Sequence, residues 1–180
     1  MRLYLVRHLP PIVAPGVCYG STDLATDPAA QALALPALQA ALPANAPVYS
    51  SPLRRCVVLA QALGQPVHTD ARLVELDFGT WEMQRWDDIA RADIDAWALD
   101  VAGYRPGGGD SVACMAARIA GFYADLVNTC ASEAVVVCHA GAIRLLTARA
   151  AGLDVDAMAQ AAAARPHAIG YGEIVILDCV

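Results

Sequence analysis

The feature of this 180-residue sequence that most constrains its fold is a set of short apolar runs alternating with longer alanine- and leucine-rich segments. The runs are residues 3–6, 48–49, 134–138 and 174–177. Short runs rich in β-branched side chains have the size of strands buried in a mostly parallel sheet. The alternation therefore predicts an α/β fold, a single three-layer domain in which helices flank a mostly parallel central sheet.

Capping residues and prolines mark where the intervening helices should begin. Asp27-Pro28 is expected to start one helix, which Pro36 should break or kink. Ser51-Pro52 should start a second, with Ser51 as its cap, and this helix is expected to end before Gly64. A third should follow Asp110-Ser111. The glycines at 107–109 are too few for a domain linker, and we expect a flexible loop there.

Composition narrows the classes of function. The chain is 57% hydrophobic and 17% charged, which excludes disorder and favours one domain with a sizeable core. Its formal net charge of -6 argues against a protein that coats nucleic acid, but not against a small anionic ligand. All 12 basic residues are arginines, whose planar donor groups suit phosphate.

Targeting and cysteine patterns point to an intracellular environment. The N-terminal apolar run is too short for a signal peptide, and no apolar stretch is long enough to span a membrane. None of the 6 cysteines forms a Cys-x-x-Cys pair, so a disulfide framework is not expected. We therefore expect a soluble, reduced, cytoplasmic protein without a membrane partner. These cysteines are Cys18, Cys56, Cys114, Cys130, Cys138 and Cys179.

Two histidines stand directly after predicted strands. His8 follows the first run, next to Arg7, and His139 follows the run that ends at residue 138. Open α/β sheets bind their ligands at the carboxyl ends of the strands, so both imidazoles are candidates for a site. One histidine at a strand end would more often be an ordinary buried residue, whereas two at the same edge favour function. A metal site built on them is a weaker alternative, because the chain lacks a compact ligand motif.

Arg55 strengthens this interpretation because it breaks a local rule. If Ser51 caps the helix, Arg55 falls in the first turn, where the helix dipole disfavours a cation. Either an acidic neighbour or a bound anion should compensate it. A phosphate held by Arg7, Arg55 and the amides that begin at Ala140 would satisfy all of these groups together.

Glu75 is the candidate acid. Apolar residues flank it on both sides, and desolvation would raise the pKa of a carboxyl group in that position. A general acid that works near neutral pH needs such a shift. Taken by itself, Glu75 would more often be an ordinary loop or helix-start acid.

Four separated motifs together resemble those of the histidine phosphatase superfamily, the phosphoglycerate-mutase-like group of phosphatases and mutases. Residues 5–8 resemble its nucleophile motif, and residues 50–55 its serine-proline-leucine-x-arginine segment. Glu75, ahead of the run at 78–82, matches the proton-donor segment. Residues 139–144 are similar to the second-histidine motif. Any one of these matches is weak, whereas four in family order are specific.

The resemblance implies a phosphomonoesterase that needs no metal or other cofactor. His8 would attack phosphorus to form a phosphohistidine, which water then hydrolyses. Arg7, Arg55 and His139 would hold the phosphate oxygens, and Glu75 would protonate the leaving group. The partner implied is a small phosphorylated metabolite rather than nucleic acid.

Within the superfamily, residues 14–24 look most like the α-ribazole phosphatase branch. That likeness implies α-ribazole 5′-phosphate, an intermediate of cobalamin biosynthesis, as substrate, with Tyr19, Gly20 and Ser21 as substrate-binding residues. The chain departs from the common pattern at Ser21 and at Met83, where glycine is frequent. A phosphoglycerate mutase, a broad small-molecule phosphatase and a non-enzymatic phosphoryl-binding protein stay open as alternatives.

We also expect a cap segment at about residues 85–110 within the single domain spanning 1–180. It contains Trp86 and Trp97. These rings could either stack on a substrate base or pack the cap against the body of the protein.

Overall fold

A single five-stranded sheet organises the computed structural model, which describes residues 1–129 and 131–179. Its strand order is β3-β2-β4-β1-β5. The strands are β1 (Arg2–Arg7), β2 (Val48–Ser50), β3 (Val67–Thr69), β4 (Glu133–Cys138) and β5 (Ile174–Asp178). The first four run parallel and β5 pairs antiparallel with β1, which confirms the expected mostly parallel sheet. Contrary to expectation, β5 is not a buried strand, because it forms an edge and leaves Ile176 55% exposed.

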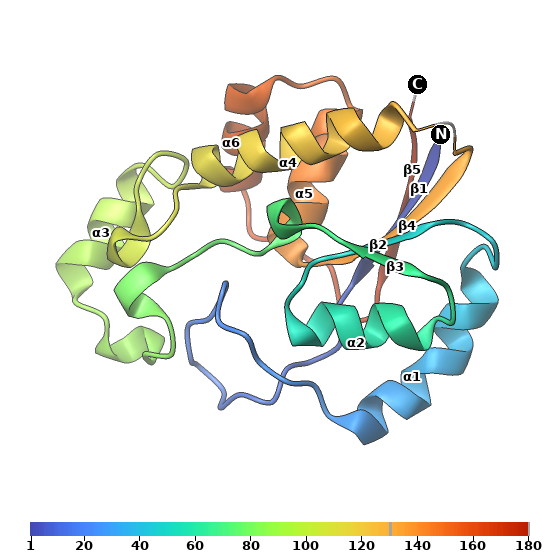
Figure 1. Cartoon of the computed structure of the whole chain (residues 1–180). Coiled ribbons are helices and arrows are strands. Elements are labelled where there is room, and N and C mark those ends of the chain that lie inside the picture. The colour runs from blue at the N-terminus through green and yellow to red at the C-terminus, as the bar shows by residue number, and fades with distance from the viewer. Residues whose placement is uncertain (130, 180) are drawn as a thin grey trace.

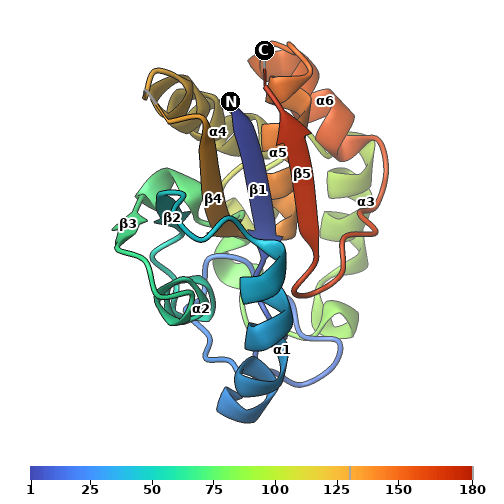
Figure 2. The same ribbon diagram turned by 90° about the vertical axis from the view of Figure 1, so that its right-hand side faces the viewer.

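Helices cover both faces of the sheet, as Figure 1 and the turned view in Figure 2 show. The smaller helical layer consists of α1 (Pro28–Ala41) and α2 (Arg54–Ala62). The larger layer, on the opposite face, consists of α4 (Val112–Val127), α5 (Ala140–Ala150) and α6 (Val155–Ala163). α3 (Arg91–Leu99) lies away from the sheet, at the left in Figure 1. The single three-layer α/β domain predicted from the sequence is therefore confirmed.

Alternating side chains on the strands build a core on each side of the sheet. Leu5 of β1 and Val136 of β4 pack in the larger layer, whereas Val6 and Val137 pack beneath α1 and α2. Successive strand residues point to opposite faces, so a sheet covered on both sides needs a continuous apolar run. This requirement explains why the buried strands stand out in the sequence as continuous apolar runs.

The expected break at Pro36 is wrong, because α1 continues through it as one helix. Asp27 caps the helix as expected, with its carboxylate accepting the amide hydrogen of Ala29 at 2.9 Å. A proline inside a helix removes the hydrogen bond to the carbonyl four residues earlier and crowds that carbonyl. Pro36 and Ala32 are both exposed, so water can hydrate that carbonyl, while the buried Leu38 holds the next turn against the sheet.

Residues 85–110 pack against residues 18 and 78–81 in a small hydrophobic cluster separate from the two main ones. Trp81 and Ile89 are buried in it, and Trp97 packs against them. Of the glycines expected to form a flexible loop, Gly107 and Gly109 are instead tightly packed, and only Gly108 faces open space. A Cβ atom at Gly107 would collide with the carbonyl oxygen of Phe78, so only glycine permits this approach.

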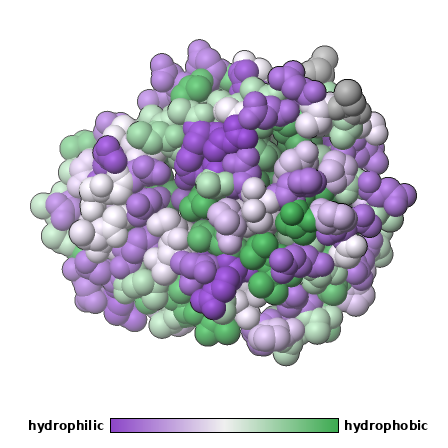
Figure 3. Space-filling model, in the orientation of Figure 1, coloured by the Kyte–Doolittle hydropathy of each residue, from purple (hydrophilic) through white to green (hydrophobic). Residues whose placement is uncertain are grey.

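In the described part of the chain, no helix has the length and apolar character to cross a bilayer. Hydrophilic and hydrophobic side chains are interspersed over the face shown in Figure 3. Five of the cysteines are free thiols, and Cys130 lies outside the described residues.

Candidate active site

The two histidines expected at strand ends lie next to each other. Arg7 of β1 is in register with Cys138 of β4, so the residues that follow them emerge side by side. The backbone amide of His8 donates to the carbonyl oxygen of Cys138 at 3.0 Å. The imidazole centroids of His8 and His139 are 5.1 Å apart in an edge-to-face arrangement. Parallel pairing of adjacent strands thus creates the juxtaposition.

His8 is held with one ring nitrogen free to react. Its side chain is only 3% exposed, and Nδ1 lies 2.7 Å from the carbonyl oxygen of Leu9. A carbonyl oxygen can only accept, so Nδ1 carries the proton and Nε2 keeps its lone pair. Burial, opposed by that hydrogen bond and reinforced by the charges of Arg55 and Arg7, lowers the pKa of His8 to about 3. The imidazole is therefore neutral and nucleophilic at neutral pH.

His139 precedes α5 and is almost completely buried. Its Nε2 lies 2.9 Å from the hydroxyl oxygen of Ser51. Burial, with the nearby charge of Arg55, lowers the pKa of His139 well below its ordinary value. Ser51 thus contacts the second histidine and does not cap α2, which begins at Arg54.

Two arginines lie in the first turn of α2, where the helix dipole disfavours cations, and the two have different partners. Arg54 has the acidic neighbour, since its amide and its guanidinium both donate to the carboxylate of Asp23, at 2.7 and 3.1 Å. Arg55 is fully buried and donates to the carbonyl oxygens of Gly20 and Thr22. Its Nε has no partner. Arg55 is thus the arginine left with a charge for a ligand.

Arg7 presents a second guanidinium to the same place. It donates to the carbonyl oxygen of Ile169 at 2.5 Å and lies 3.9 Å from the ring centroid of Tyr171. Its Nε is also buried without a partner. A buried donor without an acceptor is costly, and an anion between the two arginines would satisfy both.

Glu75 reaches the site from the loop that follows β3. Its carboxylate accepts the amide hydrogens of Gly141, at 2.9 Å, and of Leu76, at 3.0 Å. The Glu75 carboxylate is therefore hydrogen-bonded to backbone amides, one of them at the start of α5, rather than surrounded by apolar side chains. A Cβ atom at residue 141 would overlap the Glu75 carboxylate, which explains the need for glycine one position after Ala140.

Glu82 is a structural carboxylate that the sequence analysis left without a role. It accepts the amide hydrogens of Gly20, Ser21 and Phe78 and the hydroxyl of Thr22. Burial opposes its ionisation, but these hydrogen bonds hold the pKa of Glu82 below its usual range. It thereby fixes the loop whose carbonyls bind Arg55. Glu82 is the last residue of the run at 78–82 that resembles the superfamily, and this resemblance could have identified it.

Met83, next to Glu82, has a backbone φ of 66°. This is the left-handed region, which favours glycine because it has no Cβ. The backbone conformation thus accounts for the glycine that the resemblance leads us to expect at this position. It also indicates that Met83 carries a local conformational cost rather than a changed contact.

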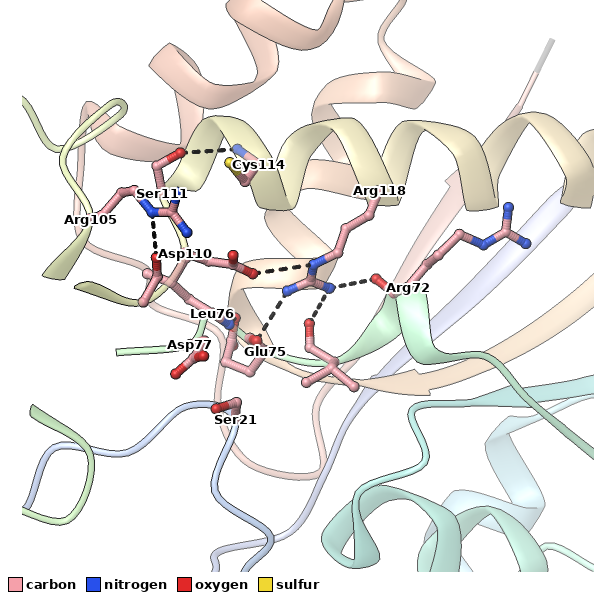
Figure 4. A network of polar contacts seen from close by, with 12 residues as sticks. Ser21, Arg72, Glu75, Leu76, Asp77, Arg105, Asp110, Ser111, Cys114 and Arg118 are labelled. Atoms are coloured by element: carbon pink, nitrogen blue, oxygen red, sulfur yellow. Dashed lines mark hydrogen bonds and ion pairs between the residues drawn. The ribbon is translucent and has the colours of Figure 1, made fainter. Parts of the chain in front are cut away.

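Arg118 of α4, another residue that the sequence analysis missed, holds the segment carrying Glu75 (Figure 4). Its guanidinium donates to the carbonyl oxygens of Arg72, at 2.6 Å, of Val74, and of Glu75, at 3.0 Å. Its Nε lies 4.0 Å from the carboxylate of Asp110. One side chain therefore ties the backbone that carries Glu75 to α4 and to Asp110, just before that helix begins.

A cavity of about 370 Å³ opens onto Arg7, His8, Arg55 and Glu75, whereas His139 does not line it. Ala140 and Tyr19 line it, as expected for binding residues, whereas Gly20 and Ser21 do not. The other lining residues are Arg7, His8, Val17, Arg55, Glu75, Leu76, Phe78, Trp86, Trp97, Val101, Val112, Met115, Gly141, Arg144, Leu145, Ala162 and His167. The lining thus combines arginine, histidine and glutamate side chains with aromatic and aliphatic ones.

The fold and this group of side chains define the class of protein. The family model described as the histidine phosphatase superfamily (branch 1) matches residues 3–172, and the chain belongs to that superfamily. The resemblance seen in the four motifs is confirmed at this level.

One curated relative in the comparison has a named activity. A glucosyl-3-phosphoglycerate phosphatase from Mycolicibacterium vanbaalenii is 34% identical over 128 residues, which cover 61% of this chain and 55% of the relative. The chain thus spans about half the length of that curated protein. These findings do not support a specific similarity to α-ribazole phosphatases.

Solved structures match along almost the whole chain. The mycobacterial glucosyl-3-phosphoglycerate phosphatase complexed with VO3 superposes with a TM-score of 0.81 at 27% identity, covering 98% of this chain and 92% of that one. A structure from Thermus thermophilus has a TM-score of 0.74 at 29% identity, covering 99% and 93%.

Proposed function

We propose that this protein is a phosphomonoesterase that acts through a phosphohistidine at His8. The observation that carries the proposal is the buried, neutral imidazole, whose free Nε2 belongs to the same cavity as Arg7 and Arg55. Fixed positive donors hold the phosphate oxygens without reorganising as the nucleophile approaches. His139 and the amide of Ala140 complete the phosphate pocket.

In the first step, the lone pair on Nε2 forms an N–P bond while the ester P–O bond breaks. Protonated Glu75 gives its proton to the departing alkoxide. In the second step, the Glu75 carboxylate takes a proton from water, whose oxygen bonds to phosphorus as the N–P bond breaks. Inorganic phosphate leaves, and His8 and Glu75 return to their starting forms.

Two candidate substrates for this reaction are each supported by a different observation. The relatives favour glucosyl-3-phosphoglycerate, and the motif at residues 14–24 favours α-ribazole 5′-phosphate. We propose residues 85–110 as a cap over the apolar end of the cavity, where Trp86 and Trp97 stack with centroids 5.9 Å apart. Hydrolysis of both compounds, measured as released phosphate without a bisphosphate primer, would rank them and separate a phosphatase from a mutase.

The phosphoenzyme provides the direct test of the proposal. His8→Ala should abolish both turnover and the acid-labile phosphoenzyme, because no other group supplies the attacking nitrogen. The measurement is rapid quench with labelled phosphate ester, followed by acid and alkali stability of the labelled protein. His68→Ala, a change at an exposed histidine of β3, should leave both unchanged. Full turnover by the His8 variant would refute the nucleophile assignment.

A further inference from the structure

Two tyrosines join the segments that hold the two arginines of the phosphate pocket. Tyr19 belongs to the loop whose carbonyl oxygens accept from Arg55, and Tyr171 to the turn before β5. Their hydroxyl oxygens lie 2.7 Å apart, a hydrogen bond between residues 152 positions apart in the chain. Burial and this bond raise the pKa of Tyr19 in spite of the arginines nearby, so its hydroxyl keeps its proton at neutral pH.

The turn that carries Tyr171 is bonded to Arg7 at three places. The backbone amide of Arg7 donates to the carbonyl oxygen of Glu173 at 3.0 Å, and its carbonyl oxygen accepts the amide hydrogen of Gly172, also at 3.0 Å. The guanidinium donates to the carbonyl oxygen of Ile169. These three bonds bring the side chain of Tyr171 onto the guanidinium.

The ring of Tyr171 covers one face of the Arg7 guanidinium. Cζ of Arg7 lies 3.9 Å from the ring centroid, and the ring centroids of Tyr171 and His8 are 5.6 Å apart. An aromatic ring attracts a guanidinium through its face, without the opposite charge that a carboxylate would bring. The donors in the plane of the guanidinium, including the unpartnered Nε, stay available for phosphate oxygens. The ring therefore holds Arg7 in place without neutralising it.

Tyr19 has the corresponding place at the other arginine. Its ring centroid lies 5.7 Å from Cζ of Arg55, and its side chain lines the cavity. The adjacent amide of Gly20 donates to the carboxylate of Glu82 at 3.0 Å, which fixes the loop. The bond between the two hydroxyls therefore ties the turn that carries Tyr171 to a firmly held loop.

We propose that the hydrogen bond between Tyr19 and Tyr171 sets the spacing of the two phosphate-binding arginines, with Tyr171 as a positioning residue for Arg7. This inference rests on the proposed function, in which Arg7 and Arg55 hold one phosphate together. A phosphate that must meet two sets of donors is sensitive to their separation, since a displacement of about 1 Å can cost about 100-fold in rate. Loss of the bond should weaken binding of the phosphoryl group itself, so inorganic phosphate is a sufficient probe.

Calorimetry with inorganic phosphate tests the inference. Tyr19→Phe and Tyr171→Phe each remove one partner of the same hydrogen bond, and each should weaken phosphate binding about fivefold. The double variant should also lose about fivefold, rather than the product of about 25-fold, because only one bond is removed. Tyr171→Leu removes the ring as well and should lose about 20-fold or more, whereas Tyr171→Phe keeps the contact with Arg7. In an Arg7→Met background, Tyr171→Leu should have no further effect.

Tyr4→Phe is the matched control. The Tyr4 hydroxyl donates to the carboxylate of Glu133 at 3.1 Å and does not line the cavity, so its loss should leave phosphate affinity unchanged. Unchanged affinity in both single phenylalanine variants at the pair would overturn the inference, and so would additive losses in the double variant. Phenylalanine differs from tyrosine only by the hydroxyl, so misfolding of Tyr171→Leu would not protect the inference.

The phosphoenzyme separates this result from the proposed function. If a His8-dependent phosphoenzyme forms but the phenylalanine variants bind phosphate normally, only the role of the tyrosine pair fails. If the variants lose affinity as expected but no phosphoenzyme forms, the positioning of the arginines stands and the catalytic proposal fails.

Discussion

At the scale of single residues, Arg55 shows how a completely buried charge is kept available for a ligand. Its hydrogen bonds go to the carbonyls of Gly20 and Thr22, which orient the guanidinium without neutralising it. A carboxylate partner would have satisfied the charge and weakened its attraction for phosphate. Backbone acceptors therefore let the side chain be rigid and still positive.

Replacing Arg55 with lysine should reduce kcat/KM about 100-fold although the net charge is preserved. An ammonium group cannot contact both carbonyls and a phosphate with the geometry of a planar guanidinium, and lost electrostatic donors typically cost this much. Steady-state kinetics on nitrophenyl phosphate measure the effect. Arg149→Lys, outside the cavity, should be nearly neutral. Comparable activity in the two variants would show that charge alone is sufficient.

The individual site residues were largely predictable, because each stands in a recognisable local setting. His8 and His139 follow strands, and Arg55 occupies a first helical turn. Arg118 was not identified as a site residue, because nothing within a few positions distinguishes it from a surface arginine. Its significance comes from carbonyl acceptors in the segment that carries Glu75.

At the scale of secondary-structure elements, α2 shows how a helix can begin without a cap of its own. Leu53 precedes it and offers no side-chain acceptor. The amide of Arg54 is satisfied by Asp23, which is 31 residues earlier in the chain. Ser51, the expected cap, is thereby free to contact His139. The sequence predicted a helix here correctly but could not identify a cap from a distant loop.

Helix α4 should influence catalysis through Arg118, the residue that holds the Glu75 segment (Figure 4). Arg118→Met should slow the hydrolysis of alkyl phosphates by about tenfold or more, while nitrophenyl phosphate, which needs little protonation, should be slowed less. Glu75→Gln should give the same pattern. Parallel kinetics on the two substrate types measure this dependence on the leaving group.

Two comparisons isolate the positioning role of Arg118. The double variant with Glu75→Gln should be no slower than Glu75→Gln alone, since the acid is already lost. Arg72→Met removes ion pairs with Asp70 and Asp125 but none of the contacts to Glu75, and should not alter the dependence on the leaving group. Equal losses on both substrates in Arg118→Met would indicate a general structural defect instead.

At the scale of the whole molecule, the buried histidines link stability to pH. The pKa of His8 is about 3 in the folded protein and about 6.5 when the chain is unfolded. Because the unfolded state binds the proton first, the free energy of unfolding falls as pH drops below about 6.5 and continues to fall to about 3. Burial also lowers the pKa of His139, so it adds in the same direction.

Urea unfolding at pH 7.5 and at pH 5 should therefore differ, with His8 contributing about 2 kcal/mol of the loss. His8→Gln should remove this contribution and give a smaller difference between the two pH values. His68→Gln changes an exposed histidine and should leave the difference as it is. An identical pH dependence in all three proteins would contradict the buried, neutral state of His8.

The sequence by itself determined the α/β class, the central strands and the histidine phosphatase motifs, because hydrophobic runs, caps and motif residues are local patterns. The tertiary structure alone decided which groups support the site: Asp23 at α2, Glu82 beneath the Arg55 loop, and Arg118 behind Glu75. These contacts join residues 31, 60 and 43 positions apart. Such partners are chosen by how the chain packs in space, and so only the folded molecule reveals them.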